Sequence, residues 1–490
     1  MKLFVLFTIL TTIFLSLSAG TPDVDYNKYF TGQTMRIDYF HIGNSSEELI
    51  TIDKIYREGE WAGSKKKLTN SFPYGKYRAK IFTSDEKTLL YSRGFDSYFG
   101  EYKTTGDAAR GIKKSYHESV LIPYPKETII LKIVQVSGRT EISTLITKKI
   151  DPSSINIIRE KRKRDIIVFD VHKTGDPSKR VDLVIVAEGY TKNDLEKVKN
   201  DFQKVKKIFF SQEPYRSNMN KFNIYGIFKP SDESGTDEPR IGKLRNTSVD
   251  TTFNSLGSAR YLLTEANKKL RDITSAAPCD AIMIMVNSTR YGGGGIYNSF
   301  CTFTIDNKQA SYLILHEFGH SFSGLADEYY SSAVSYNDFY PKGIEPVEPN
   351  ITALLDPAKI KWSSLVKDGT KIPTPWGKRD FDRMNNEFGK KRKEINLKIE
   401  RLTRSGASKE KILQAKQEIE SLMKEKEKEN REFFSRSGLT GVVGAFEGAG
   451  YSSKGMYRPM IDCIMFTIGK KPYCKVCENA VSEMIKKYSD

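Results

Sequence analysis

Cysteine is scarce in this chain, and so are histidine and tryptophan. The 490 residues include 5 cysteines, 5 histidines and 3 tryptophans. Small proteins that are built around disulfides contain far more cysteine, so a disulfide-based scaffold is excluded. The cysteines all lie in the C-terminal half: Cys279, Cys301, Cys463, Cys474 and Cys477. Because their number is odd, at least one thiol is unpaired or is paired with another chain.

Two of these cysteines, Cys474 and Cys477, form a C-x-x-C pair. Such a pair can be redox-active or can supply half of a zinc knuckle. Because the chain has no second C-x-x-C pair, we expect a structural disulfide instead. It would join these two residues or would link one of them to another cysteine.

Long apolar segments are also missing, except at the start of the chain. There, Leu3–Leu17 follows the positive charge of Lys2 and leads into three small residues at 18–20. This pattern is typical of a secretory signal peptide, which we place at residues 1–20. No later segment approaches the 18 continuous apolar residues of a membrane span. No cysteine follows the cleavage region, so a bacterial lipid anchor is excluded. We expect a secreted chain that has no transmembrane segment once the signal peptide is removed.

A nucleic-acid-binding motif is absent as well, although the chain carries a formal net charge of +17. The charge is densest in Lys161–Arg164 and in a Lys/Glu-rich stretch at 387–432. Without a recognition motif, a solvated basic surface is the simpler interpretation of this charge. We therefore expect no nucleic-acid partner.

What the sequence does contain is a clear change of pattern along its length. Alternating apolar and polar residues predict short strands in the first part: Met35–Ile42, Tyr77–Ile81, Glu127–Val136 and Glu141–Lys148. Strands at this spacing favour an all-β sandwich, an accessory domain over residues 24–160. The charged residues Arg159–Arg164 then form the linker to a second domain at 165–490.

The second domain alternates strands with helices, as an α/β layer architecture does. Continuous apolar runs predict buried strands at Val181–Glu188, Phe222–Phe228 and Ala281–Val286. Helical spacing of apolar residues predicts helices at Leu195–Val205, Ser258–Ile273 and Ala310–Phe322. The glycines of Gly292–Gly295 are expected to form a loop that precedes an edge strand at Ser299–Ile305.

A charged stretch at 385–434 is rich in helix-forming residues and is interrupted at Ser405–Ser408. We interpret it as an antiparallel helical hairpin that is inserted in the second domain.

The chemistry is carried by His316, Glu317 and His320, which form the pattern H-E-x-x-H at the end of an apolar helix. Residues i and i+4 share one face of a helix, so both imidazoles can bind one zinc ion. Zinc lowers the pKa of a bound water, and Glu317 can take the proton as this water attacks a carbonyl carbon. With only five histidines in the chain, this spacing rarely arises by chance.

The third ligand is expected to be a carboxylate, because no histidine follows the motif. The pattern H-E-x-x-H-x-x-G-x-x-H places a glycine at 323 and a ligand at 326, where this chain has Ser323 and Ala326. Here the glycine and a carboxylate come one residue later, at Gly324 and Asp327. We favour Asp327 because it keeps the usual separation between the glycine and the ligand. Glu328 is the alternative: it could be the ligand itself, or a carboxylate that orients a histidine.

Four segments also carry a family resemblance: Val186–Thr191, His316–Tyr329, Ile372–Trp376 and Tyr457–Met465. They make the chain similar to the IgA-peptidase family of zinc metallopeptidases, from about residue 165 to the end. The resemblance implies a metzincin-like, zincin-type α+β catalytic domain, with His316, His320 and Asp327 on zinc and Glu317 as general base. It also implies that Met465 lies in a turn beneath the metal, although its apolar character is equally compatible with a core position.

Two further roles are weaker hypotheses. Tyr329 or Tyr457 could stabilise an oxyanion opposite the zinc, although most tyrosines are structural. The segment Gly292–Gly295 and the strand after it could bind an extended peptide as an added strand. A plain flexible loop is the alternative for the glycines.

The sequence therefore predicts a secreted zinc-dependent endopeptidase with a protein or peptide substrate. One alternative is a peptidase that is limited to short peptides or chain ends. The other is a binding or adhesion protein with a structural zinc site. The intact Glu317 disfavours the last, because a structural site needs no base and is normally closed by a fourth protein ligand.

Overall fold

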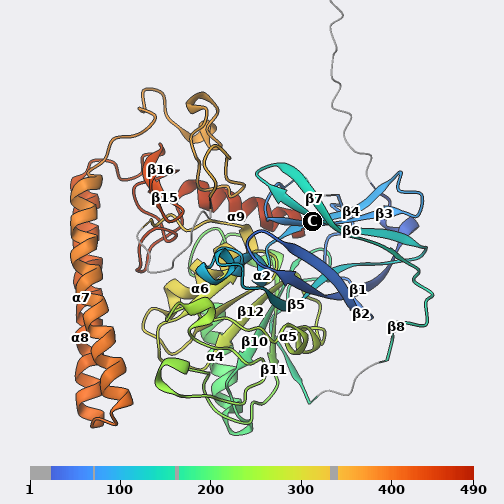
Figure 1. The fold of residues 1–490 in the computed structure, drawn as a ribbon, viewed down its shortest axis with the longest axis horizontal. Helices are drawn as coiled ribbons and strands as arrows, with labels where there is room; N and C mark the ends of the chain where they lie inside the picture. The colour runs from blue at the N-terminus through green and yellow to red at the C-terminus, as the bar shows by residue number, and fades with distance from the viewer. Residues whose placement is uncertain (1–23, 70–71, 161–164, 331–339, 490) are drawn as a thin grey trace, which may run out of the picture.

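The computed structural model describes residues 24–69, 72–160, 165–330 and 340–489, and Figure 1 shows their arrangement. The expected signal peptide and the basic run Lys161–Arg164 lie outside the described residues. In the part of the chain that is described, every helix is too short or too polar to cross a membrane.

The N-terminal part is β-rich and consists of two four-stranded sheets. One has the order β5–β1–β2–β8, with strands β1 (Phe30–Gly43), β2 (Glu48–Glu60), β5 (Lys114–Pro125) and β8 (Ile157–Ile158). The other has the order β4–β3–β6–β7, with strands β3 (Tyr77–Thr83), β4 (Leu89–Phe95), β6 (Ile129–Ser137) and β7 (Thr140–Ile150). Alternate residues of both sheets, such as Ile37 and Ile81, point into one shared apolar core. Strands are thus present wherever the alternating pattern predicts them in this part.

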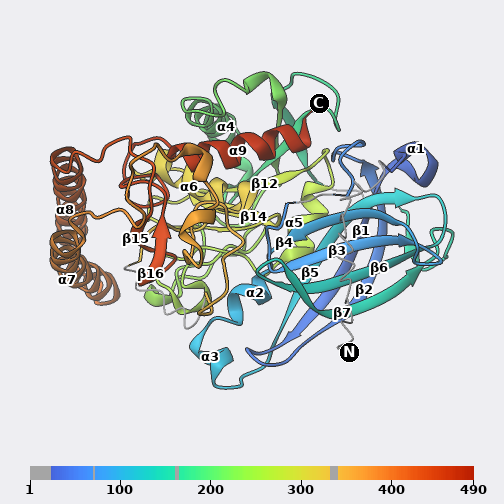
Figure 2. The ribbon, with the colours of Figure 1, turned by 90° about the horizontal axis from the view of Figure 1, so that it is seen from above.

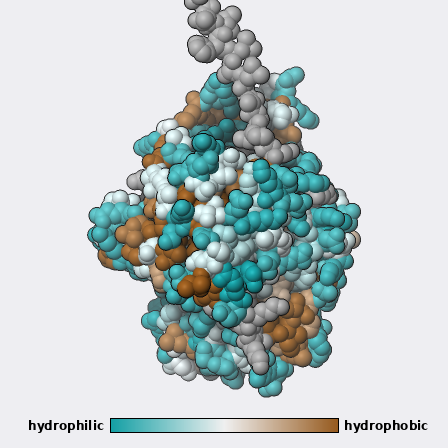
Figure 3. All heavy atoms as spheres, turned by 90° about the vertical axis from the view of Figure 1, so that its right-hand side faces the viewer, coloured by the Kyte–Doolittle hydropathy of each residue, from teal (hydrophilic) through white to brown (hydrophobic). Residues whose placement is uncertain are grey.

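Three short helices belong to the same part: α1 (Tyr26–Tyr29), α2 (Tyr98–Tyr102) and α3 (Gly106–Ala109). The face of this part that Figure 3 displays is mostly hydrophilic, with separate apolar areas. Scattered apolar residues of this kind are normal on a solvated surface.

A six-stranded sheet forms the centre of the C-terminal part, with the order β13–β14–β12–β10–β11–β9. Its strands are β9 (Ile167–His172), β10 (Val181–Glu188), β11 (Phe222–Phe228), β12 (Ala281–Val286), β13 (Gly293–Ile296) and β14 (Phe300–Thr304). The four inner strands are parallel, and the two edge strands β9 and β13 run antiparallel to their neighbours. All residues of β10 are buried because both faces of the sheet are covered.

Different elements pack against the two faces of this sheet. Leu183 and Ile185 face the helices α4 (Leu195–Phe209) and α6 (Ala310–Ser323). Val184 and Val186 face the opposite way, toward α5 (Asn267–Thr274) and the aromatic residues of α2. The N-terminal part therefore packs directly against the sheet that carries α6.

Two predictions for this region are wrong. The helix expected at Ser258–Ile273 begins only at Asn267, because the preceding chain is extended and hydrogen-bonds to other segments, as Leu263 does with Thr252. The glycines expected in a loop form the edge strand β13, and the strand expected at the edge, β14, lies inside the sheet between β13 and β12.

The charged stretch forms the expected helical hairpin, with α7 (Lys378–Arg404) and α8 (Lys409–Arg436). Its first helix begins earlier than predicted, at Lys378. Phe381 and Phe434 anchor its base in the main core, while Lys398 and Glu418 pair at 2.7 Å on the exposed arms. Figures 1 and 2 place the hairpin at the end of the molecule opposite the two N-terminal sheets. The last elements are β15 (Phe446–Ala449), β16 (Ser452–Arg458) and α9 (Lys475–Tyr488).

Candidate metal centre

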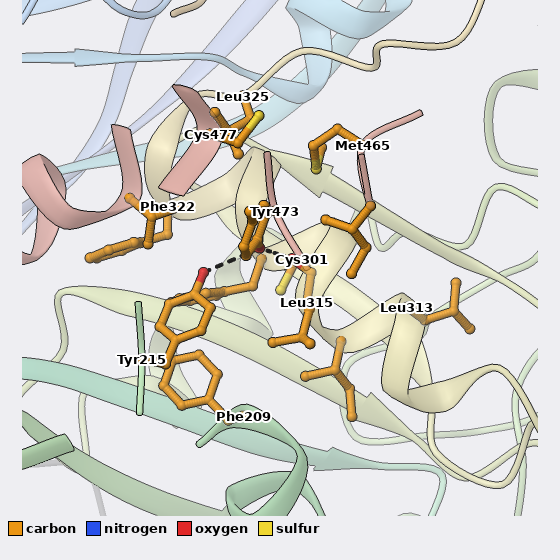
Figure 4. Packing of buried hydrophobic residues seen from close by; sticks show 14 of the residues in the cluster. Phe209, Tyr215, Cys301, Leu313, Leu315, Phe322, Leu325, Met465, Tyr473 and Cys477 are labelled. Atoms are coloured by element: carbon orange, nitrogen blue, oxygen red, sulfur yellow. Dashed lines mark hydrogen bonds between the residues drawn. The ribbon is translucent and has the colours of Figure 1, made fainter. Parts of the chain in front are cut away.

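The helix α6 places the H-E-x-x-H residues inside the molecule. Its apolar residues, including Leu313, Leu315 and Phe318, are fully buried against the sheet and α4. Figure 4 shows this packing around α6, with Phe209 of α4 on one side of the helix. The helix ends at Gly324, which adopts the left-handed conformation at φ 61° and donates its N–H to His320 O at 3.0 Å. This turn reverses the chain and carries the residues after Gly324 back toward the two histidines.

His316, His320 and Asp327 meet in a triangle of nitrogen and oxygen atoms. The Nε2 atoms of the histidines are 3.2 Å apart. Asp327 Oδ1 lies 3.1 Å from His316 Nε2 and 3.2 Å from His320 Nε2. Tetrahedral zinc with bonds of about 2.0–2.1 Å separates neighbouring ligand atoms by about 3.3–3.4 Å. The triangle therefore fits one face of such a site.

The other polar side-chain atoms of these three residues contact the surrounding protein. His316 Nδ1 lies 3.0 Å from Ile464 O, and His320 Nδ1 lies 2.6 Å from Leu325 O. A ring whose Nδ1–H donates to a carbonyl keeps Nε2 free as a metal ligand. Tyr451 donates its hydroxyl to Asp327 Oδ2.

Asp327 Oδ1 is buried and faces the Nε2 atoms of His316 and His320, where a bound cation would compensate its charge. Burial alone raises the pKa of Asp327, but the His320 and His316 imidazoles outweigh this effect and hold it well below its usual range. A carboxylate that binds a metal ion is likewise in its ionised form.

Glu317 stands beside the triangle. One of its oxygens and one ring nitrogen from each of His316 and His320 all lie within 4.8 Å of one another. Burial raises the pKa of the Glu317 carboxyl above its ordinary value of 4.5, and the two imidazoles oppose this effect. A carboxylate with a raised pKa can both accept and return a proton near neutral pH.

The glycines of β13 allow this strand to pass close to α6. A Cβ at Gly293 would lie 2.9 Å from Glu317 Oε1, and a Cβ at Gly295 would lie 2.4 Å from Glu317 O. A Cβ at Gly294 would meet the Tyr261 ring at 2.6 Å on the other side. Packing within the chain therefore explains these glycines without any close approach of a substrate.

A cavity opens beside these residues, and its lining comes from several parts of the chain. Arg260, Tyr329 and Tyr451 are among the lining residues, and Arg260 donates from Nη2 to Tyr329 OH at 3.0 Å. Asp96 and Glu101 of the N-terminal part also line the cavity. Of the two tyrosines that the sequence suggested, Tyr329 lines the cavity and Tyr457 does not. No sequence motif marks Arg260, Asp96, Glu101 or Tyr451, because they approach the site only through the tertiary fold.

Met465 packs against the helix that carries the histidines. It is fully buried, and its Sδ would lie 3.2 Å from a Cβ placed on Gly319. Its carbonyl oxygen accepts the N–H of Glu328 at 2.8 Å. Met465 is thus held both against α6 and against the segment that supplies Asp327.

Glu328 does not face the histidines. Its Oε1 lies 3.1 Å from Cys477 Sγ and accepts from Asn350 Nδ2 at 3.1 Å. The expected disulfide is also absent, since all five cysteines are free thiols. Cys463 and Cys477 approach each other without a bond, with their sulfurs 3.8 Å apart.

Models of known families match two parts of the chain. A model of the family described as IgA Peptidase M64 matches residues 169–485, and one described as Peptidase M64 N-terminus matches residues 25–147. A search of the curated proteins found no match to the chain. The first family match covers more than half of the sequence and includes the whole candidate metal centre. The chain therefore belongs to the IgA peptidase M64 family and is a metallopeptidase.

Proposed function

We propose that the protein is a secreted, zinc-dependent endopeptidase with a metzincin-like catalytic domain. The observation that supports it best is the triangle of His316 Nε2, His320 Nε2 and Asp327 Oδ1, with sides of 3.1–3.2 Å. Three protein ligands leave a fourth position open, which is the arrangement of catalytic zinc sites. The turn at Gly324 and the packing of Met465 beneath α6 support the metzincin-like assignment.

In this proposal His316, His320 and Asp327 hold the zinc ion. When bound, zinc supplies a Lewis acid for the peptide carbonyl and lowers the pKa of water at the site. Glu317 takes the proton of the attacking water and then gives it to the leaving amine. The hydroxyl of Tyr329, which Arg260 holds at 3.0 Å, is positioned to donate to the oxygen on which negative charge develops.

Substitution of Glu317 tests the role of the general base. We expect Glu317→Gln to keep its zinc and to lose about 10²–10⁴-fold in kcat on an unfolded protein, because the amide cannot accept the proton. Elemental analysis measures the zinc, and a fluorescent casein assay measures cleavage. Glu196→Gln, at an exposed residue of α4, is the matched control and should be fully active. Full activity of Glu317→Gln would remove this residue from the mechanism.

The position of cuts tests the substrate class. Mass spectrometry of a digested protein mixture should find cuts inside chains, and a chelator should abolish them. Cuts confined to chain ends or to short peptides would favour the narrower peptidase instead. The same method applied to the secreted protein should find an N-terminus just after the small residues at 18–20.

A further inference from the structure

A second cluster of metal-ligating side chains lies next to the candidate catalytic centre. It consists of Glu328 and the thiols of Cys463, Cys474 and Cys477, whose ligand atoms all lie within 4.8 Å of one another. All four residues are buried, with exposed fractions between 0% and 4%. Figure 4 shows Cys477, Leu325 and Met465 gathered on one side of α6. The catalytic mechanism uses none of the four.

Three separations within this cluster lie near those of a zinc tetrahedron. Zinc–sulfur bonds of about 2.3 Å at tetrahedral angles place two sulfurs about 3.8 Å apart. A carboxylate oxygen with a bond of about 2.0 Å then lies about 3.5 Å from each sulfur. Cys463 and Cys477 are 3.8 Å apart, and Glu328 Oε1 lies 3.1 Å from Cys477 and 3.8 Å from Cys474.

The carboxylate of Glu328 has no cation of its own among the described residues. Its Oε2 is buried without a hydrogen-bond partner, and no Lys or Arg among the described residues lies within ion-pair distance of it. The nearby guanidinium of Arg458 is held elsewhere, because it stacks on Trp376 and Phe466 and donates to the carbonyl of Gly448 at 2.8 Å. A buried carboxylate is unfavourable without a counter-charge, and a bound cation would supply one.

The backbone around the sulfurs is arranged for thiolates. Cys463 Sγ accepts the N–H of Cys474 at 3.2 Å and that of Met465 at 3.4 Å. Cys474 caps the N-terminus of α9, and its sulfur accepts the N–H of Cys477 at 3.5 Å. A helix N-terminus and N–H donors stabilise negative sulfur, which is the form that binds metal. A disulfide would use only two of the three sulfurs and would leave the third beside the unpaired carboxylate.

We propose that Glu328, Cys463, Cys474 and Cys477 bind a second zinc ion, which has a structural role. Four protein ligands close the coordination sphere, as in structural rather than catalytic sites. Glu328 follows Asp327 directly and donates its N–H to Met465 O at 2.8 Å. The second ion thereby ties the segment that carries Asp327 to the segment that carries Met465 and to the start of α9.

Zinc content of the full chain tests this proposal without any activity assay. We expect two zinc ions per chain in the wild type and one in the double variant His316→Ala, His320→Ala. Adding Cys474→Ser and Cys477→Ser to this variant should remove the remaining ion. Cys279→Ser in the same background is the matched control and should keep it. A folded histidine variant without zinc, or a quadruple variant that still holds one ion, would overturn the proposal.

A spectroscopic measurement works on the unaltered chain and is independent of folding in the variants. Cobalt(II) in this site should give the intense near-ultraviolet charge-transfer absorption of thiolate ligands, which the histidine and carboxylate ligands of the other site cannot give. Absence of this band, or a disulfide between any two of the three cysteines in non-reduced peptide maps, would refute the second site. One zinc per chain together with the band would refute only the catalytic site.

The carboxylate ligand can be tested by affinity. Glu328→Gln should weaken zinc binding at least about tenfold in competition with a chromophoric chelator, measured in the histidine variant. Glu483→Gln, at an exposed residue of α9, is its control. Equal affinity in both variants would remove Glu328 from the site.

Discussion

Gly319 lies in the H-E-x-x-H helix, and three side chains approach it closely. A Cβ there would lie 3.2 Å from Met465 Sδ, 3.2 Å from Leu325 Cδ1 and 3.1 Å from Tyr473 OH. These contacts are tighter than ordinary van der Waals contact, and the three residues come from one well-packed core. We therefore expect Gly319→Ala to destabilise the protein by about 1–3 kcal/mol through overpacking.

Urea unfolding measures this effect, and Gly389 offers a matched control. Gly389 lies inside α7, and a Cβ placed on it would meet no other atom within 4 Å. Gly389→Ala should stabilise its helix by about 0.5–1 kcal/mol, since alanine is the better helix former. Equal effects of the two substitutions would contradict close packing at Gly319.

The two neighbouring carboxylates show how far single residues can be interpreted from sequence. The spacing after Gly324 predicts that Asp327 approaches the histidines, and in the structure its Oδ1 does so. The surroundings of Glu328 could not be predicted, because Cys474 and Cys477 follow it by 146 and 149 residues. Only the fold brings these thiols to the carboxylate. The sequence does not show that Glu328 and Cys463 lie beside the C-x-x-C pair. From the sequence alone, the pair therefore favours a disulfide.

At the scale of elements, His41 links strands of the first sheet through two buried carboxylates. Its Nδ1 lies 3.1 Å from Glu118 on β5, and its Nε2 lies 3.1 Å from Glu48 on β2. Burial lowers the pKa of His41, but the hydrogen bonds to Glu118 and Glu48 outweigh it and raise the pKa above 6.5. Burial raises the pKa of Glu48, but His41 and Lys103 outweigh it and lower the pKa below 4.5.

The stability of this sheet should therefore depend on pH in two directions. The His41 contribution is complete below pH 6.5 and is lost as the pH rises through the raised pKa. The Glu48 contribution is present above pH 4.5 and is lost as the pH falls through the lowered pKa. We expect His41→Gln to cost about 3–5 kcal/mol at pH between these values, because it leaves buried carboxylates unpaired.

Thermal unfolding of the wild type and this variant across the pH range checks the prediction. The difference in Tm between them should be largest near pH 5–6 and should shrink above neutrality. His172→Gln is the control, since the His172 ring contacts Met219 O at 3.0 Å and the edge of the Phe210 ring rather than buried carboxylates. A difference in Tm that does not change with pH would contradict the charged state of His41.

The sequence predicts best those elements whose residue pattern can arise from a single kind of structure. The strands Val181–Glu188, Phe222–Phe228 and Ala281–Val286 match the structure at both ends, because a buried parallel strand is a continuous apolar run. The helix expected at Ser258–Ile273 fails because Leu262 and Leu263 are buried in an extended segment instead. Burial alone does not distinguish a helix from such a segment, and the pairing partner of Leu263, Thr252, is not visible in the pattern.

At the scale of the molecule, the N-terminal part forms part of the site as well as part of the core. Asp96 and Glu101 line the cavity beside the candidate metal centre, and Tyr261 OH donates to Glu101 Oε2 at 3.2 Å. The backbone N–H of Asp96 donates to Tyr297 O at 2.9 Å. Arg36 pairs with Asp272 at 2.9 Å across the same boundary. These contacts fix the wall of the cavity relative to α6.

The same boundary makes the catalytic part dependent on its N-terminal neighbour. Phe99 and Tyr102 of α2 share one buried cluster with Val184, Val186 and other residues of the six-stranded sheet. Removal of residues 24–160 would expose this apolar face to water, at a cost of about 25 cal/mol for each Å². We expect residues 165–490 alone to bind a hydrophobic dye and to unfold at a lower Tm than the longer chain. Addition of residues 24–160 as a separate chain should reverse both effects. A fragment that matches the stability and activity of the longer chain would show that the catalytic part does not depend on the N-terminal part.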